Sequence, residues 1–213
     1  MSILLIMELN SPYIQRFELP EAVLGEFYGK EVPEPFVPSF TENRFTAGES
    51  PSLITADLSG TLTWLQQLEL PKPFEREGGA IPFLLFSPHF STGHLLFHYD
   101  GTSNSTELIK NFIRLFGNSI QDSKATIISP SFIPKSKIRE EQEVIELVAS
   151  STKETSFIKF NFVNIGDFCS YGIDHNCTLL VTTKNYQADL AEVLFQFSRR
   201  KVWDVGMSFY LSP

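Results

Sequence analysis

The sequence GHLLFHYDGTSNSTELIKNFIRLFGNSIQDSKATIIS, residues 93–129, decides the fold. It begins and ends with short apolar runs that are typical of strands. Between them, residues 104–107 resemble a capping box with Asn104 in the cap position. Apolar residues then recur at helical spacing until Gly117, namely Leu108, Ile109, Phe112, Ile113 and Phe116. This stretch therefore predicts a strand, an amphipathic helix and a second strand in succession.

The same two periodicities extend outward from this stretch in both directions. Strands are predicted at 3–9, 52–58, 81–86, 93–99, 125–129, 157–165, 177–183 and 207–211. Beyond the helix already described, further helices are predicted to open at Pro20, to span 61–70, to run from Ser136 for about 15 residues, and to span 188–200. Strands and helices thus alternate along much of the chain.

Short connections fix the expected type of sheet. At least two pairs of neighbouring strands, among them 81–86 with 93–99, have connections too short for a helical crossover, so we expect them to be antiparallel. We therefore predict a single α+β domain in which amphipathic helices pack on a mixed β-sheet. Its predicted core consists of 81–86, Leu95, Phe97, Leu108, Phe112, Ile127, Ile128, Phe160, Phe162, Leu179, Val181, Leu190, Leu194 and Phe197.

The two parts of the chain differ in composition. Residues 1–88 hold ten of the 13 prolines and carry 12 acidic against five basic residues, whereas the remainder is nearly balanced in charge. We expect one domain over 1–213, with a regular α/β scaffold at 81–213. The stretch 29–51 is rich in proline and phenylalanine, and we expect it to pack on the domain as an ordered arm, because a disordered linker seldom carries so many aromatic residues.

The charge of the chain narrows the classes of partner. A formal net charge of -8 disfavours binding to nucleic acid, and the basic run at 199–201 is explained by its place at the end of a predicted helix. No apolar run is long enough to span a membrane, and no secretory signal is visible. Cys169 and Cys177 are then expected to be reduced thiols. We expect an acidic, soluble, cytoplasmic protein.

One predicted loop gathers reactive side chains. Residues 166–177, between two predicted strands, contain two thiols, one imidazole and two carboxylates. Cys169 is the candidate nucleophile, His175 or His94 the candidate base, and Asp174 or Asp167 the candidate orienting carboxylate, because a thiol needs an adjacent base to react as thiolate. The alternative interpretation is that Cys177 packs as a small apolar residue and that His175 is a solvated turn residue.

The histidines suggest no metal site. His94 and His98 lie on one face of a predicted strand, but at ~3.3 Å per residue they are about 13 Å apart, which is too far for one metal ion. No glycine-rich phosphate loop, zinc-protease motif or serine-hydrolase elbow is present. No metal and no cofactor are therefore predicted.

The order of elements over 93–183 is similar to that of CheD-type protein-glutamine deamidases. It consists of a strand bearing a histidine, an amphipathic helix, a short strand, a second helix and a strand pair. That family uses a cysteine upstream of its histidine, and no cysteine precedes His94 in this chain. The glycine-rich strand end expected after the helix is also replaced, by residues 129–131. The similarity therefore concerns the order of elements, and the chain is not assigned to the family.

Two functions are indicated by these patterns as hypotheses. The favoured one is a non-catalytic protein-binding or accessory module, because catalytic motifs are missing, the first half is acidic and some of the 20 phenylalanines are available for a partner. A basic protein is the expected kind of partner, since the chain is acidic. The alternative is a cysteine-dependent amidohydrolase or deamidase that uses the Cys–His site.

Overall fold

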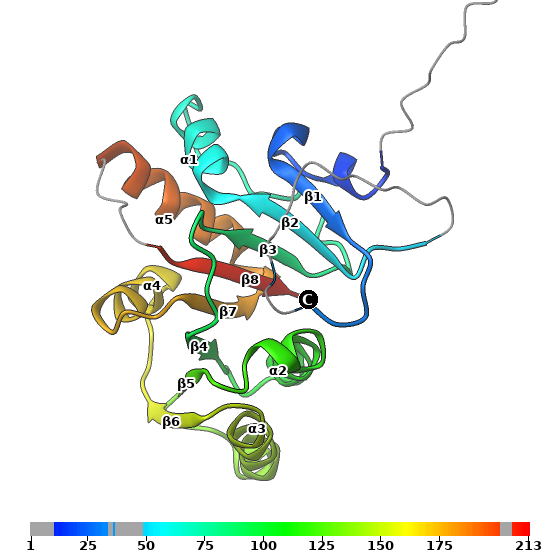
Figure 1. Cartoon of the computed structure of the whole chain (residues 1–213). Coiled ribbons are helices and arrows are strands. Elements are labelled where there is room, and N and C mark those ends of the chain that lie inside the picture. The colour runs from blue at the N-terminus through cyan, green and yellow to red at the C-terminus, as the bar shows by residue number, and fades with distance from the viewer. Residues whose placement is uncertain (1–10, 34–35, 37–48, 201–205) are drawn as a thin grey trace, which may run out of the picture.

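One mixed sheet organises the computed structural model, which describes residues 11–33, 36, 49–200 and 206–213 (Figure 1). Its strands are β1 (Leu24–Phe27), β2 (Leu53–Asp57), β3 (Phe83–Phe86), β4 (His94–His98), β5 (Lys124–Ser129), β6 (Glu154–Lys159), β7 (Leu179–Thr183) and β8 (Ser208–Ser212). The α-helices are α1 (Leu58–Gln66), α2 (Ser103–Phe116), α3 (Ile138–Ser151), α4 (Ile165–Asp174) and α5 (Gln187–Arg200). The predicted strand 3–9 and most of the arm 29–51 lie outside the described residues.

The order of the strands is β1-β2-β3-β8-β7-β4-β5-β6. The last five strands in this order, β8 to β6, are parallel to one another. At the other end, β3 is antiparallel to β8, and β1 is antiparallel to β2. The sheet is therefore mixed, with helices packed against it, and the predicted α+β fold is confirmed.

The predicted antiparallel pairing of 81–86 with 93–99 is wrong. In the sheet β3 pairs with β2 and β8, whereas β4 pairs with β5 and β7. The connection between them passes over two strands, and its first residue, Ser87, donates its backbone N–H to Ser208 Oγ on β8 at 2.9 Å. A short connection can join strands that are not neighbours, so its length alone did not determine the pairing.

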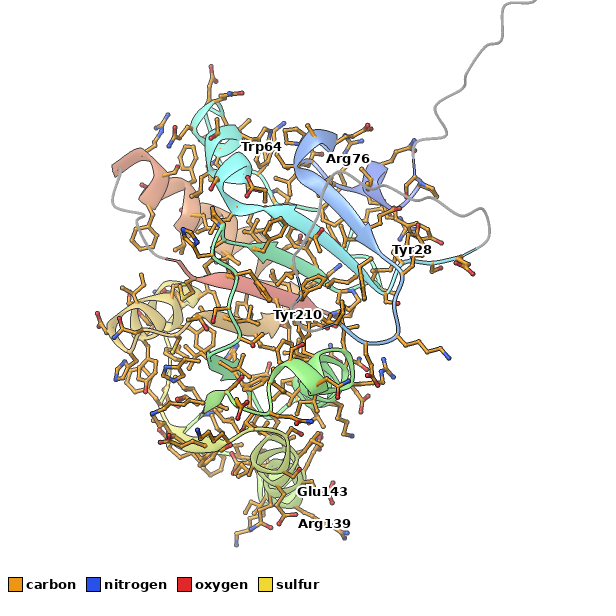
Figure 2. All side chains as sticks on the ribbon, viewed as in Figure 1. Tyr28, Trp64, Arg76, Arg139, Glu143 and Tyr210 are labelled. Carbon is orange, nitrogen blue, oxygen red and sulfur yellow. The ribbon has the colours of Figure 1, made fainter. Side chains whose placement is uncertain are left out.

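Helices cover both faces of the sheet (Figure 1). Apolar residues of α2 and α3 pack on one face, together with Tyr210 of β8, which is labelled in Figure 2. The Tyr210 ring makes edge contacts with the rings of Phe112 and Phe116. Apolar residues of α1, α4 and α5 pack on the other face. The N-terminal cap of α2 is Thr102, whose side chain accepts from Ser105 N–H, and not Asn104 as predicted.

Most of the predicted core is buried. The buried residues are 83–86, Leu95, Phe97, Leu108, Phe112, Ile127, Ile128, Leu179, Val181, Leu190 and Leu194. Four more, Ile81, Pro82, Phe162 and Phe197, are only partly buried. The prediction is wrong for Phe160, whose side chain is 47% exposed.

The error at Phe160 has a structural cause. The predicted strand 157–165 ends at Lys159, and the chain then folds across the edge of the sheet into α4. Asn164 caps that helix by accepting from Asp167 N–H, while the Asp167 carboxylate accepts from the backbone of Asn164. This capping box makes residues 165–174 helical, so the predicted loop at 166–177 is wrong.

A buried ion pair fastens the segment before β3 to the sheet. Lys184, directly after β7, donates to Glu75 at 2.5 Å and to the backbone oxygen of Gly79 at 3.1 Å. Glu75 also accepts from the backbone N–H of Gly79 at 2.9 Å. Both charged side chains are almost fully buried, so removing either partner would leave an uncompensated charge in the interior.

α4 approaches the sheet closely at Gly172. A Cβ atom at this position would lie 3.0 Å from Leu180 Cδ1, 3.1 Å from Met207 Sδ and 3.4 Å from Leu96 Cδ2. All three neighbours are buried residues of the core. Glycine therefore sets the distance between this helix and the strands beneath it. No described helix is both long enough and apolar enough to cross a membrane.

We expect Gly172→Ala to lower the free energy of unfolding by about 1 kcal/mol, because overpacking of ~1–3 kcal/mol exceeds the helix-propensity gain of up to ~1 kcal/mol. Gly117→Ala is the matched control, since a Cβ there meets nothing within 4 Å and the backbone is helical. It should be neutral or slightly stabilising. Urea unfolding of both variants measures the difference, and equal effects would contradict the close approach.

Candidate functional site

The order of the parallel strands creates a crevice at one edge of the sheet. Along the chain, β4, β5 and β6 follow one another in one direction, and β7 and β8 are then added on the other side of β4. The connections that leave β4 and β7 therefore diverge to opposite faces. In doubly wound sheets, ligands bind at the carboxyl ends of the strands at such a reversal.

A cavity of about 340 Å³ lies at this place, and we call it the switch-point crevice. β4 contributes His98 and the two residues after it, and β5 contributes Ser129 and Pro130. The segment 160–165, which leads from β6 into α4, forms the opposite wall, and Tyr186 after β7 completes it. The volume is at the lower end of the range for small ligands, which is enough for one large side chain.

His98, the last residue of β4, lines the crevice. Its Nδ1 lies 3.1 Å from Thr182 Oγ1 on β7, so a hydrogen bond crosses the point of reversal. Its ring is 5.2 Å from the rings of Phe168 and Tyr186 and 6.1 Å from that of Phe162, between centroids. Burial lowers the pKa of His98, although the nearby Asp100 carboxylate acts in the opposite direction. The imidazole is therefore neutral at pH 7.

Asp100 supplies a carboxylate beside this imidazole. Its Oδ1 accepts from both the backbone N–H and the hydroxyl of Thr102, at 2.8 and 2.6 Å. The intervening Gly101 has a φ of 80°, a left-handed conformation that glycine adopts without strain. Burial opposes the charged form of Asp100, but the hydrogen bonds, led by those from Thr102, hold its pKa below the ordinary value. The crevice therefore carries a negative charge at neutral pH.

Three exposed apolar side chains lie on the two loops that form this crevice, and we call them the apolar rim. Phe160 and Val163 line the crevice, and Phe132 follows two residues after Pro130, which also lines it. Phe132 is 83% exposed, Val163 is 90% exposed and Phe160 is 47% exposed. The loops that carry them are tied together, because Ser131 N–H donates to Asn161 Oδ1 at 2.9 Å. Among the described residues, only two other large apolar side chains, Leu70 and Ile138, are exposed. Apolar surface is thus concentrated at the crevice.

Buried polar contacts hold one wall of the crevice in place. Ser129 donates its hydroxyl to Glu141 Oε1 on α3 at 2.5 Å. Lys159, at the end of β6, donates to the same oxygen at 2.5 Å and to Ser129 Oγ at 3.1 Å. These contacts join β5, β6 and α3 below the apolar rim. These hydrogen bonds connect the wall in the absence of a ligand.

The residues predicted from sequence lie elsewhere. Cys169 faces the core from the interior of α4 and is fully buried. His175 caps the C-terminal end of the same helix, six residues later, which is about 9 Å along the axis. Its ring stacks on that of Tyr171 at 3.9 Å, and the adjacent Asp174 is exposed. Within the described part of the chain, no hydrogen bond joins either thiol to an imidazole.

His94 lies at the opposite edge of the sheet from the switch-point crevice. It begins β4, and its ring is near the backbone of His175 and 3.4 Å from Thr126 Oγ1. The structure thus brings His94 and His175 together, but it keeps Cys169 in the core. The described residues contain no cluster of three or more His, Cys, Asp or Glu side chains able to hold a metal ion. Cys169 and Cys177 are both free thiols.

Sequence reasoning missed the crevice because its residues are brought together only by the strand order. The spacing of the histidines on β4 argued against a metal site and indicated no other function for His98. No sequence pattern pointed to Tyr186 or Val163. Comparison with known proteins finds no matching family, no matching characterised protein and no matching solved structure. The function of this chain therefore has to be inferred from the geometry of the crevice.

We expect both thiols to resist alkylation in the folded protein. Burial raises the pKa of Cys169 to about 12 and that of Cys177 to about 11. Compared with a free cysteine of pKa ~8.5, the thiolate of Cys169 is then roughly a thousandfold scarcer at pH 7.5. Iodoacetamide labelling followed by mass spectrometry, with and without urea, measures the protection. Labelling of native Cys169 at the rate of free cysteine would contradict its place in the core.

Stability should decrease as the pH falls below the pKa of histidine in the unfolded chain. The folded-state pKa of His98 is lowered, so the unfolded chain binds the proton more readily, and acid favours unfolding from about pH 6.5 downward. His98→Asn should weaken this dependence without abolishing it, because burial also lowers the pKa of His94. Urea unfolding at pH 7.5 and 5.0 tests this. The exposed His89→Asn is the control and should retain the full dependence.

Proposed function

We propose that this chain is a non-catalytic binding module and that its ligand is part of a protein partner, seated in the switch-point crevice. The observation that carries the proposal is the apolar rim around a preformed cavity. Phe132, Phe160 and Val163 are exposed to water in the free protein, although two of them are large aromatic residues. Burying such a side chain contributes roughly 1.5–3 kcal/mol, so a partner that covers the rim gains substantial affinity.

The shape of the site favours a protein partner over a small molecule held alone. The cavity accommodates one side chain, and two of the rim residues expose more than four-fifths of their surface to water. A partner that fills the cavity and also covers the rim uses both features. This arrangement resembles the usual organisation of interfaces, in which an anchoring side chain enters a pocket and surrounding contacts exclude water.

The alternative, a cysteine-dependent amidohydrolase or deamidase, has less support. Its proposed nucleophile, Cys169, is fully buried, and burial disfavours its thiolate. The candidate base His175 lies at the far end of the same helix. A thiol enzyme needs an accessible thiolate close to an imidazole, so the Cys–His function would require a large rearrangement of α4.

The proposal predicts that binding depends on the rim. A photo-crosslinking residue at position 132 should capture the partner, which mass spectrometry identifies, and the purified partner is then used in calorimetry. Phe132→Ser combined with Val163→Ser should weaken its affinity at least tenfold, because two apolar side chains no longer contribute to burial.

Leu70→Ser provides the matched control, since Leu70 is 75% exposed and lies outside the crevice. This variant should bind as the wild type does. All three exposed positions tolerate serine without loss of core contacts, so unchanged thermal unfolding should accompany both variants. A partner whose affinity is insensitive to the rim, or is lowered equally at Leu70, would refute the proposal.

A further inference from the structure

The switch-point crevice continues into a second cavity of the same charge. This cavity, of about 660 Å³, lies between α4 and α5 and shares Asn164 and Ile165 with the crevice. Asp189 and Glu192 of α5 line it, and no lysine or arginine lines either cavity. Asp100 in the crevice and these two residues in the adjoining cavity together make up what we call the acidic surface.

The carboxylates on this surface are not neutralised by cations of the described chain. None of the ion pairs between described residues includes Asp100, Asp189 or Glu192. The nearby ammonium groups at this edge are already engaged, Lys184 by Glu75 and Lys159 by Glu141. The surface thus keeps three negative charges that a ligand can meet.

Aromatic rings lie beside the same carboxylates. Tyr186 lines the crevice together with Asp100, and burial, followed by the charges of Asp100 and Asp189, raises its pKa. Phe160 and Phe162 lie on the opposite wall, with their ring centroids 5.0 Å apart. Aromatic faces attract cations, and they also pack against the methylene groups that carry an ammonium or guanidinium.

We propose that the crevice binds a lysine or arginine side chain of a protein partner. This inference rests on the proposed function and names the chemistry of the inserted residue. The apolar stem lies against Phe160, Phe162 and Tyr186, and the cationic head meets Asp100. Further basic residues of the same partner segment meet Asp189 and Glu192. His98 is neutral and therefore does not repel the cation at pH 7.

Other ligand classes fit less well. An anion would meet three carboxylates that form no ion pair with a described residue, and Asp100 already accepts from Thr102 at the N-terminus of α2. A purely apolar side chain would leave the charge of Asp100 desolvated without a counter-ion, which is unfavourable. A cation on an apolar stem satisfies both the carboxylate and the rings.

The test is a titration of the full chain, labelled with ¹⁵N, with three short acetylated and amidated peptides. Their sequences are Ala-Leu-Lys-Leu-Ala and the same sequence with norleucine or glutamate in place of lysine. Amide shifts at 98–102 and 160–165 report binding in the crevice. We expect the lysine peptide to bind at least fivefold more tightly than the norleucine peptide, and the glutamate peptide to bind most weakly.

Variants of the protein assign the effect to the carboxylates. Asp100→Asn keeps an oxygen that can accept from Thr102 but removes the charge. This variant should lower the affinity for the lysine peptide at least threefold. Asp189→Asn with Glu192→Gln, at exposed positions of α5, provides a second test that does not touch the helix cap. Asp122→Asn is the control, because this exposed residue precedes β5 at the opposite edge and should leave binding unchanged.

The outcomes separate this inference from the proposed function. If the norleucine peptide binds as tightly as the lysine peptide, the proposed recognition of a cation is refuted, while the proposal of an apolar binding site is retained. If free cadaverine binds as tightly as the lysine peptide, the site binds a free amine, and the proposal that the cation belongs to a protein partner is refuted. If no peptide shifts the crevice amides at millimolar concentration and the partner is also insensitive to the rim, both proposals fail.

Discussion

The reversal of strand order between β4 and β7 is the constraint on which the rest of the structure depends. Parallel strands need crossover connections, and these are almost always right-handed, so successive strands added on opposite sides of β4 place their helices on opposite faces. α2 and α3 therefore cover one face and α4 and α5 the other (Figure 1). Because the chain leaves β4 and β7 in opposite directions, their carboxyl ends cannot be covered by either helix layer. The crevice is a direct result of this topology.

The parts of the fold that could be predicted from sequence are those with strong local periodicity. The apolar stripe Leu108, Ile109, Phe112 of α2 indicated a helix on a core, and all three residues are buried. The alternation around Phe160 was misleading, because a segment that crosses the sheet edge can alternate without pairing. In α4 the glycines and polar residues resembled a loop, while the capping residue Asn164 was overlooked.

The candidate site was less predictable than the fold for a physical reason. Cys169 and His175 are close in sequence, but a helix separates them along its axis and turns them to different sides. His98, Asp100 and Tyr186 are far apart in sequence and come together only because β4 and β7 are neighbours. Which strands pair depends on the packing of the whole domain, so local sequence patterns do not reveal it. The mixed sheet itself was predicted correctly, although from a strand pair that does not form.

The charge of the crevice affects whether a second copy of the chain or a different protein covers the apolar rim. Exposed phenylalanines favour association, and a second copy of the same chain would be the simplest occupant. A two-fold dimer through the rim would bring Asp100, Asp189 and Glu192 of one copy towards the same carboxylates of the other, because both copies contribute the same face. Repulsion at short range opposes this association, whereas a basic segment experiences attraction at the same distance. In the proposed function, the apolar rim and carboxylates without an ion pair to a described residue would therefore oppose self-association and favour a cationic partner.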